Sequence, residues 1–239
     1  ISERLDRLRQ REDFAAHPFK AVAKRVYYRL RSKVNKRPWT LTLDGDIRVR
    51  APIISTPATA IFYLGASEPW TLRLYKSLLR PGMMVADIGA HIGEYSLVAA
   101  RDVGKAGRVF AFEPGEAVYP FLVENIGLND AGNVTPCRSA IGDAEGELAF
   151  NLGVDPGHSR LVIDDHGAHG LASKGIVRVP TTTLEAVEAE HGVTFDLLKI
   201  DVEGAELDVL LGARALLERT GSSAPIILFE YLPRTWGEY

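Results

Sequence analysis

The sequence predicts an α/β fold built on a doubly wound, mostly parallel sheet. From residue 83 onward, short apolar runs alternate with segments of helical periodicity. Uninterrupted apolar runs are typical of strands that helices cover on both faces. Four of these runs end in a carboxylate, and ligands in such sheets bind beyond the carboxyl ends of the strands. These observations together indicate one globular domain with a polar site along one edge of its sheet.

An N-terminal extension is expected before this domain. Residues 1–36 are rich in Lys and Arg and predict one or two amphipathic helices. Residues 39–49 alternate apolar and polar side chains around Asp44-Gly45, a dipeptide favoured in hairpin turns. We therefore expect a basic helical segment plus a short β-hairpin over residues 1–60, and the main domain over residues 61–239. The apolar stripe of the helical segment is formed by Phe19, Val22, Val26, Leu30 and Val34.

The main domain is expected to begin with a helix over residues 70–79 and to continue as alternating strands and helices. The expected strands are 83–88, 108–113, 134–141, 147–152, 195–202 and 225–231. The expected helices are 94–102, 117–128, 183–189 and 205–218. Residues 153–174 are rich in glycine and histidine and interrupt the alternation, so we expect a lid or a disordered segment there.

Composition and charge narrow the class of protein. The chain has 239 residues and a net charge of −3, but residues 1–37 carry 12 Lys and Arg against 4 Asp and Glu. This division suggests a basic appendage on an acidic body. A single cysteine, Cys137, excludes an intrachain disulfide and favours a reducing compartment, so we expect a cytoplasmic protein. The longest uncharged run, 51–67, contains two prolines and is too short to span a bilayer as a helix.

The glycine loop after the first strand of the main domain does not fit a dinucleotide site. The dinucleotide pattern would place glycine at 89, 91 and 94, where the chain has Gly89, His91 and Glu94. Asp87 would also bring negative charge to the turn that holds a pyrophosphate. S-adenosylmethionine has no phosphate and carries an ammonium and a sulfonium, so it suits this acid. Glu113, at the end of the next strand, can accept hydrogen bonds from both ribose hydroxyls.

Over about residues 61–231 the sequence resembles the FkbM-type methyltransferases, which mostly O-methylate sugars and secondary metabolites. The motifs that carry the resemblance are Asp87-Ile88-Gly89-Ala90-His91-Ile92-Gly93, Phe112-Glu113-Pro114, Ala140-Ile141-Gly142-Asp143 and Lys199-Ile200-Asp201-Val202-Glu203-Gly204-Ala205-Glu206. The resemblance implies a class I, Rossmann-like methyltransferase fold with S-adenosylmethionine as cofactor and S-adenosylhomocysteine as product.

The same resemblance implies roles for single residues. Asp87, Gly89 and Gly93 would border the methionine part of the cofactor, and Glu113 the ribose. Ser139 and Ala140 would border the adenine, and Asp201 the region near the reactive methyl. The full expected cofactor set is Glu68, Asp87, Gly89, Ala90, His91, Gly93, Tyr95, Ser96, Glu113, Pro114, Ser139, Ala140 and Asp201.

Three features of the chain depart from the family pattern. The family usually has Asn where His91 stands and an aromatic residue where Ser67 stands. The chain also stops nine residues after Glu230, before the last antiparallel hairpin that methyltransferases of this class normally add. Two interpretations stay open: residues 61–239 lack that hairpin because the sequence is truncated, or further residues complete the sheet.

Methyl transfer to a hydroxyl oxygen needs a group that removes a proton while the new bond forms. The candidates are Asp201, Glu203 and Glu230, which stand at or just after strand ends. Three clustered acids can instead hold a divalent metal, but the resemblance implies none and we expect a metal-free site. Glu203 has an alternative role as a partner for a backbone N–H at the start of the next helix. We place no catalytic weight on the loop histidines His158, His166 and His169, whose spacing is irregular.

The sequence therefore predicts an S-adenosylmethionine-dependent O-methyltransferase that acts on a hydroxyl of a sugar, glycan or secondary metabolite. Two alternatives remain: a non-catalytic binding module on the same fold, and a nicotinamide-dependent oxidoreductase. Nucleic acid is not an expected partner, because the acidic body offers no second basic patch. The apolar stripe formed by residues 19, 22, 26, 30 and 34 has to be buried against another surface. Three surfaces are possible: the chain's own domain, a second copy in a homodimer, or a membrane. Of these we favour protein contact.

Overall fold

The computed structural model describes residues 18–34, 37–52, 55–153, 160–162, 173–202 and 204–230. Its centre is a five-stranded parallel sheet in the order β11-β10-β3-β4-β5. The chain enters this sheet in the middle, runs outward to one edge and then returns to the other side of β3. The doubly wound parallel fold is thereby confirmed, and the strand order reverses beside β3. The strands are β3 (Met84–Ile88), β4 (Arg108–Phe112), β5 (Val134–Cys137), β10 (Leu197–Ile200) and β11 (Ile226–Phe229).

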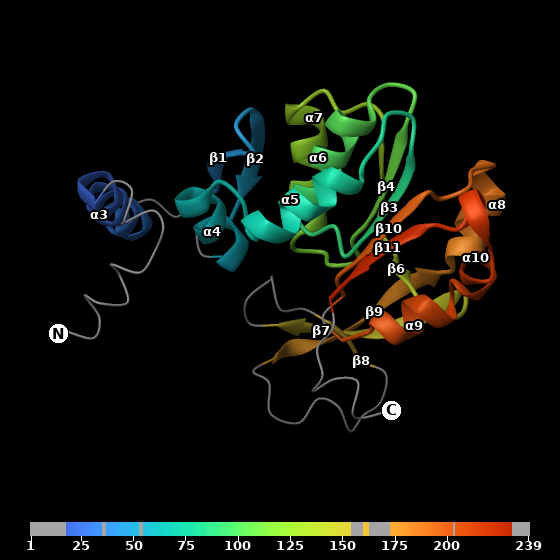
Figure 1. The fold of residues 1–239 in the computed structure, drawn as a ribbon. Helices are drawn as coiled ribbons and strands as arrows, with labels where there is room; N and C mark the ends of the chain where they lie inside the picture. Colours follow the sequence, from blue (N-terminus) through green and yellow to red (C-terminus); the bar gives the residue numbers. More distant parts are fainter. Residues whose placement is uncertain are drawn as a thin grey trace.

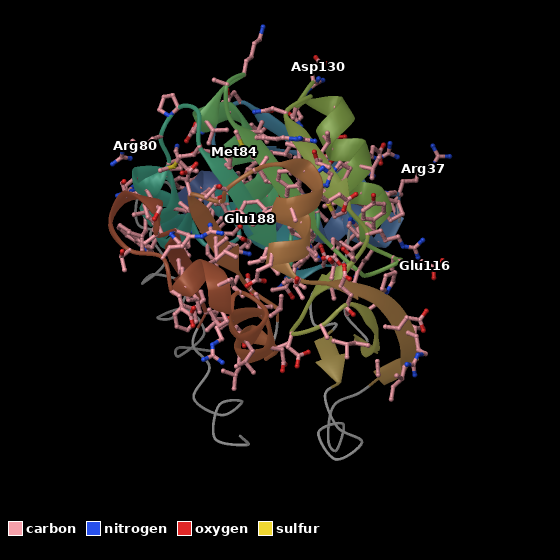
Figure 2. The ribbon with its side chains drawn as sticks, turned by 90° about the vertical axis from the view of Figure 1, so that its right-hand side faces the viewer. Arg37, Arg80, Met84, Glu116, Asp130 and Glu188 are labelled. Carbon is pink, nitrogen blue, oxygen red and sulfur yellow. The ribbon has the colours of Figure 1, made fainter. Side chains whose placement is uncertain are left out.

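Two layers of helices cover the faces of the sheet (Figure 1). One layer consists of α5 (Pro69–Leu78), α6 (Glu94–Val103) and α7 (Tyr119–Leu128). The other consists of α8 (Leu184–His191), α9 (Glu206–Leu211) and α10 (Arg214–Leu217), and its residue Glu188 faces the viewer in Figure 2. Consecutive strand residues point to opposite faces, so each strand supplies both cores. In β4, Val109 and Ala111 belong to the first core, and Phe110 and Phe112 to the second.

A second, smaller sheet lies beside the first and was only partly predicted. Its strand order is β6-β9-β7-β8, with β6 (Ala140–Ile141), β7 (Gly146–Gly153), β8 (Arg160–Val162) and β9 (Ser173–Thr182). The expected single strand 134–141 is therefore divided between two sheets. Within the expected loop 153–174, residues 160–162 and 173–174 are strand, so that part of the prediction is wrong. The pairing of β7 with β9 is antiparallel and joins residues far apart in the sequence. The periodicity of a short segment cannot predict which distant segment it pairs with.

The expected helix 205–218 is also interrupted. It consists of two short helices, α9 and α10, separated by Gly212 and Ala213. A Cβ atom on Gly212 would lie 1.9 Å from the carbonyl oxygen of Gly142. The segment therefore packs backbone against backbone on the loop after β6, and it turns there instead of continuing as one straight helix.

The N-terminal hairpin is confirmed, with β1 (Trp39–Leu43) and β2 (Ile47–Ala51) paired in antiparallel register around Asp44-Gly45. Its inward residues belong to the same buried cluster as α5, α6 and α7. An additional helix, α4 (Thr56–Leu64), begins at Ser55, whose hydroxyl accepts a hydrogen bond from the Ala58 amide. The division of the chain at residue 60 stays a prediction. The expected absence of a final hairpin concerns residues 231–239, which lie outside the described residues.

The first described helix, α3 (Pro18–Val34), lies beside α4 at the outer end of the molecule (Figure 1). It contacts the domain through the side opposite the expected stripe. Ala21 is buried, and the Tyr28 hydroxyl lies 2.7 Å from the Thr59 hydroxyl. The residues of the expected stripe are exposed, from 48% at Val22 to 90% at Phe19. Of the three possible covers of this stripe, the described part of its own domain is therefore excluded.

The reason lies in the aromatic cluster beneath α3. Trp39, Phe62 and Tyr28 pack against one another with ring centroids 5.2–5.6 Å apart. The Arg31 guanidinium lies 5.2 Å from the centre of the Trp39 ring, and the Lys24 ammonium lies 5.6 Å from that of Phe62. Aromatic area and cation–π contacts thus select this side of α3 over the aliphatic side. Among the helices described in the chain, none is both long and apolar enough to cross a membrane.

Candidate functional site

The turn after β3 brings the backbone into close contact with the end of β10. Gly89 has a φ of 83°, and a Cβ atom there would lie 1.8 Å from the carbonyl oxygen of Asp201. Gly93, which precedes α6, has a φ of 90°. The amides of Gly89 and Ala90 both donate to the Phe112 carbonyl, at 3.0 and 2.9 Å. Glycine is therefore required at residue 89 by conformation and by space together.

Asp87 lies beneath this turn as a fully buried carboxylate. The Ser96 hydroxyl of α6 donates a hydrogen bond of 2.5 Å to Oδ2, and the Lys199 ammonium lies 3.8 Å from Oδ1. Oδ1 accepts no hydrogen bond from the described residues. Burial raises the pKa of Asp87, and Lys199 and Ser96 partly offset that effect.

Lys199 is a site residue to which the sequence analysis gave no role. It lies in β10 directly opposite Asp87 of β3, and its side chain is almost fully buried. The ammonium donates to Asp201 Oδ2 at 3.0 Å and lies 4.5 Å from the centre of the Tyr95 ring. Burial works to lower the pKa of Lys199, but Asp201 and Asp87 outweigh it and hold the pKa above its ordinary value. A signal was present, since Lys199 is a charged residue inside an otherwise apolar strand.

A second group of acids lies at the start of α5 and α6. Tyr95 donates a hydrogen bond of 3.2 Å to Glu68, so these two predicted residues are brought together. Glu94, which was not predicted, is buried and accepts a hydrogen bond of 2.8 Å from the Ser67 backbone amide. Ser67 is thus held through its backbone, a contact that does not require the aromatic side chain usual in the family.

Glu113 ties together the loops after β3 and β4. Its two carboxylate oxygens accept hydrogen bonds from the amides of His91, at 2.9 Å, and Gly115, at 2.6 Å. His91 has a φ of 52°, which turns its amide towards this carboxylate. Burial raises the pKa of Glu113 to about 7, although the two amides act against that shift. The adjacent Pro114 is half-buried.

The predicted adenine residues follow the next strand. The Glu113 amide donates to the Cys137 carbonyl at 3.0 Å, so the end of β5 lies beside the predicted ribose carboxylate. Ser139 is half-buried in the bend after β5, and Ala140 is buried at the start of β6. The carboxyl ends of β3, β4 and β5 therefore carry their predicted residues side by side.

The predicted catalytic carboxylates lie at the ends of β10 and β11. The Asp201 amide donates to the Ile88 carbonyl at 3.0 Å, and the Glu230 amide donates to the Ile200 carbonyl at 3.2 Å. Partial burial raises the pKa of Glu230, and the nearby carboxylates of Asp201 and Glu68 add to this effect. Asp201 and Glu230 thus share one end of the sheet. Glu203 and the three loop histidines lie outside the described residues.

Glu206 makes the contact that was considered as an alternative for Glu203. It is fully buried, and its Oε1 accepts hydrogen bonds from the amides of Val202, at 3.4 Å, and Gly204, at 3.0 Å. This carboxylate therefore holds the turn between β10 and α9. In the described part of the chain, no group of three or more His, Cys, Asp or Glu residues is arranged to hold a metal ion.

The site has an acidic character that its geometry explains. The carboxylates of Asp87, Asp201, Glu68 and Glu230 act electrostatically on one another or on Lys199. Because parallel strands end at one edge of the sheet, Asp87 and Glu230 lie at the same edge although they are 143 positions apart in the sequence. Such a site favours a ligand that brings positive charge.

Comparison with known proteins agrees with this geometry. A family model described as the methyltransferase FkbM domain matches residues 87–237, which is more than half of the chain. The hexuronic acid methyltransferase AglP of Haloferax volcanii is 29% identical over 133 residues, covering 55% of this chain and 50% of that protein. The methyltransferase sdnD of Sordaria araneosa is 32% identical over 154 residues, covering 54% and 59%.

A third relative, the 31-O-demethyl-FK506 methyltransferase FkbM of Streptomyces tacrolimicus, is 31% identical over 160 residues, covering 56% of this chain and 60% of that protein. The chain thus spans between half and three fifths of the length of these curated relatives.

Proposed function

The chain belongs to the FkbM methyltransferase family, and on this basis we propose that it transfers a methyl group from S-adenosylmethionine to a hydroxyl oxygen of a sugar, glycan or secondary metabolite. The observation that carries the proposal is the glycine turn after β3, packed against Asp201 and lined by carboxylates where the strand order reverses.

The residues at this turn suit S-adenosylmethionine. Asp87 offers a buried oxygen, Oδ1, that accepts no hydrogen bond from the described residues. The acids around the turn complement the ammonium and sulfonium charges, whereas a pyrophosphate would meet like charge. In the proposed site, the 87–93 turn holds the methionine part, Glu113 the ribose, and Ser139 and Ala140 the adenine.

The chemistry requires alignment and the removal of one proton. When bound, S-adenosylmethionine supplies a methyl group on a positively charged sulfur. The close contact of Gly89 with Asp201 positions the end of β10 beside the turn, and Lys199 orients the Asp201 carboxylate through its hydrogen bond. Alignment of this kind accounts for much of the rate in a displacement reaction.

The proton acceptor is proposed to be one of the carboxylates Asp201, Glu203 and Glu230. A carboxyl with a raised pKa, as at Glu230, is a stronger base once ionised. The Asp201 carboxylate is already engaged by the Lys199 ammonium at 3.0 Å. We therefore place Glu230 ahead of Asp201 and keep Glu203 as the second candidate to test.

The acceptor class is proposed from the relatives' names. AglP is named for hexuronic acid, and FkbM for a demethylated oxygen of FK506. Both names agree with a sugar or a secondary metabolite as the class of acceptor.

Cofactor binding is tested by calorimetry of the whole chain with S-adenosylmethionine, S-adenosylhomocysteine and NAD. We expect binding of the first two, and Glu113→Ala is expected to weaken it by about 1.5–3 kcal/mol, because hydrogen bonds to a charged group are lost. Glu116→Ala is the matched control, since Glu116 is exposed three residues further on and lies at the outer edge of the molecule in Figure 2. Binding of NAD without S-adenosylmethionine would favour an oxidoreductase instead.

Turnover is tested as S-adenosylhomocysteine release with a panel of hexuronic acids and polyketide alcohols. Glu230→Gln and Glu203→Gln are expected to keep cofactor affinity, and loss of the base is expected to lower turnover by about 10²–10⁴. Glu218→Gln serves as the control, because Glu218 is an exposed carboxylate just after α10. Unchanged turnover in both site variants would exclude these two carboxylates as the base.

The proposal that the reaction needs no metal ion is tested in the same turnover assay. Added chelator is expected to leave turnover unchanged, and activity that chelation abolishes and magnesium restores would overturn it. Cofactor binding without turnover on any acceptor in the panel would favour the binding module.

A further inference from the structure

The helix α3 has two unlike sides, of which the domain covers one. Ala21 and Tyr28 lie on the covered side, and the Lys24 ammonium reaches the Phe62 carbonyl there at 3.2 Å. The opposite side carries an exposed apolar row that we call the α3 stripe. At 3.6 residues per turn, its members fall on one face of a helix about 25 Å long. The α3 stripe consists of Phe19, Val22, Val26, Leu30 and Val34.

Positive charge flanks the α3 stripe. The 17 residues of α3 include six Lys and Arg and no Asp or Glu. The helical register places Arg29 and Lys33 beside the stripe. Lys24, Arg25 and Arg31 lie nearer the covered side, where their charged groups lie over the rings of Phe62, Tyr63 and Trp39. The exposed surface of α3 is therefore an apolar row bordered by the exposed cations Arg29 and Lys33, on a helix that has no acidic residue.

This charge argues against a second copy of the chain as the cover. Packing one α3 stripe on another would bring the helix axes to about 8–10 Å from each other. That separation is comparable to the Debye length, about 8 Å at physiological ionic strength, so salt would screen the positive charges of the two helices only in part and they would repel. A partner that covers the stripe needs an apolar region that can bury the stripe and negative charge beside that region.

We propose that the α3 stripe docks this protein on the surface of an anionic lipid bilayer. A helix with an apolar face and basic borders lies in the plane of a bilayer interface, with its apolar side among the acyl chains and its basic residues at the lipid phosphates. A bilayer needs no groove complementary to the helix, which suits a single convex row of side chains. The opposite side of α3 meanwhile stays on the aromatic cluster of Trp39 and Phe62, so docking leaves the fold unchanged.

The inference is tested by flotation of the full chain with vesicles of phosphatidylglycerol and phosphatidylcholine, compared with phosphatidylcholine alone. The expected result is flotation with the anionic vesicles and none with the neutral ones, weakened by added salt. The double variant Val26→Glu with Leu30→Glu is expected to stay at the bottom of the gradient. The control is Leu74→Glu with Leu211→Glu, two leucines of similar exposure, 51% and 55%, on other helices, and it is expected to float.

A second variant keeps the test decisive if the glutamates disturb α3. Arg29→Gln with Lys33→Gln leaves the stripe intact and is expected to lower the vesicle partition coefficient roughly 25-fold, since each basic residue near an anionic surface contributes about fivefold. Circular dichroism checks that helix content is retained.

Three results would overturn the inference. These are no flotation of the full chain at low salt, flotation of the glutamate variant equal to that of the parent, and a dimer by light scattering that the glutamate variant alone abolishes. The last result would assign the stripe to a second copy. Binding of S-adenosylmethionine in solution is expected to be the same in all these variants, so the outcome is independent of the proposed reaction.

Discussion

The closest backbone approach in the site, between Gly89 and the Asp201 carbonyl, makes a sharp prediction for Gly89→Ala. The added Cβ would lie 1.8 Å from that oxygen, whereas ordinary van der Waals contact begins at 3.4 Å. The ends of β3 and β10 would have to separate by about 1.6 Å to admit the methyl group. Because the contact is with the backbone of Asp201, no side chain can rotate away to relieve it.

The expected magnitude has two parts. An L-residue with φ near 83° costs about 1–2 kcal/mol, and the forced separation of two packed segments costs about 1–3 kcal/mol more. Gly82→Ala is the matched control, since Gly82 has a φ of 88° and a Cβ atom added there would meet nothing within 4 Å. Gly82→Ala therefore has only the conformational cost of the positive φ and no steric cost. The difference between the two variants therefore isolates the close approach.

Thermal unfolding and calorimetry together measure the effect. At about 2–4 °C per kcal/mol for a chain of this size, Gly89→Ala should melt roughly 2–12 °C below Gly82→Ala. Its affinity for S-adenosylmethionine should fall more than about tenfold, because the turn proposed to hold the cofactor moves, while Gly82→Ala should keep the parent's affinity. Equal melting temperatures and equal affinities in the two variants would refute the reasoning.

Three further predictions follow from buried polar groups. Since the pKa of Glu113 is raised to about 7, the carboxyl holds its proton at pH 6 and loses it by pH 8; affinity for S-adenosylmethionine, measured by calorimetry, should rise about tenfold over that range and stay flat in Glu113→Gln. Lys199→Met leaves a buried carboxylate without its cation and should lower the free energy of unfolding in urea by about 3–5 kcal/mol; a loss below about 1 kcal/mol would contradict the buried pair. Asn125→Ala removes the amide that pairs with the backbone of Arg50 and Ile92, and should cost roughly 2–4 kcal/mol in the same assay, with wild-type stability as the contrary result.

The sequence alone was sufficient to predict the central sheet and to place several candidate site residues at the ends of its strands. Strands buried on both faces are recognisable as continuous apolar runs. The turn after β3 is recognisable because glycine follows the strand and because Asp87 is a charged residue within an otherwise apolar strand. Asp87, Glu113 and Asp201 could therefore be placed at strand ends, and parallel strands bring their ends to one edge whatever the connections between them.

Tertiary structure decided which surfaces meet. The role of Lys199 depends on its register opposite Asp87, 112 residues earlier, and local periodicity carries no register between distant strands. The pairing of β7 with β9 was missed for the same reason, although Val177, Val179 and Thr181 alternate with exposed residues. For α3, the sequence identified an apolar side, but the helix packs on the domain through its other side. The reason is that the ring of Tyr28 and the cations of Lys24 and Arg31 pack on aromatic rings from β1 and α4. The sequence of a helix shows which of its sides is apolar. It does not show on which surface the helix packs, because residues elsewhere in the chain form that surface.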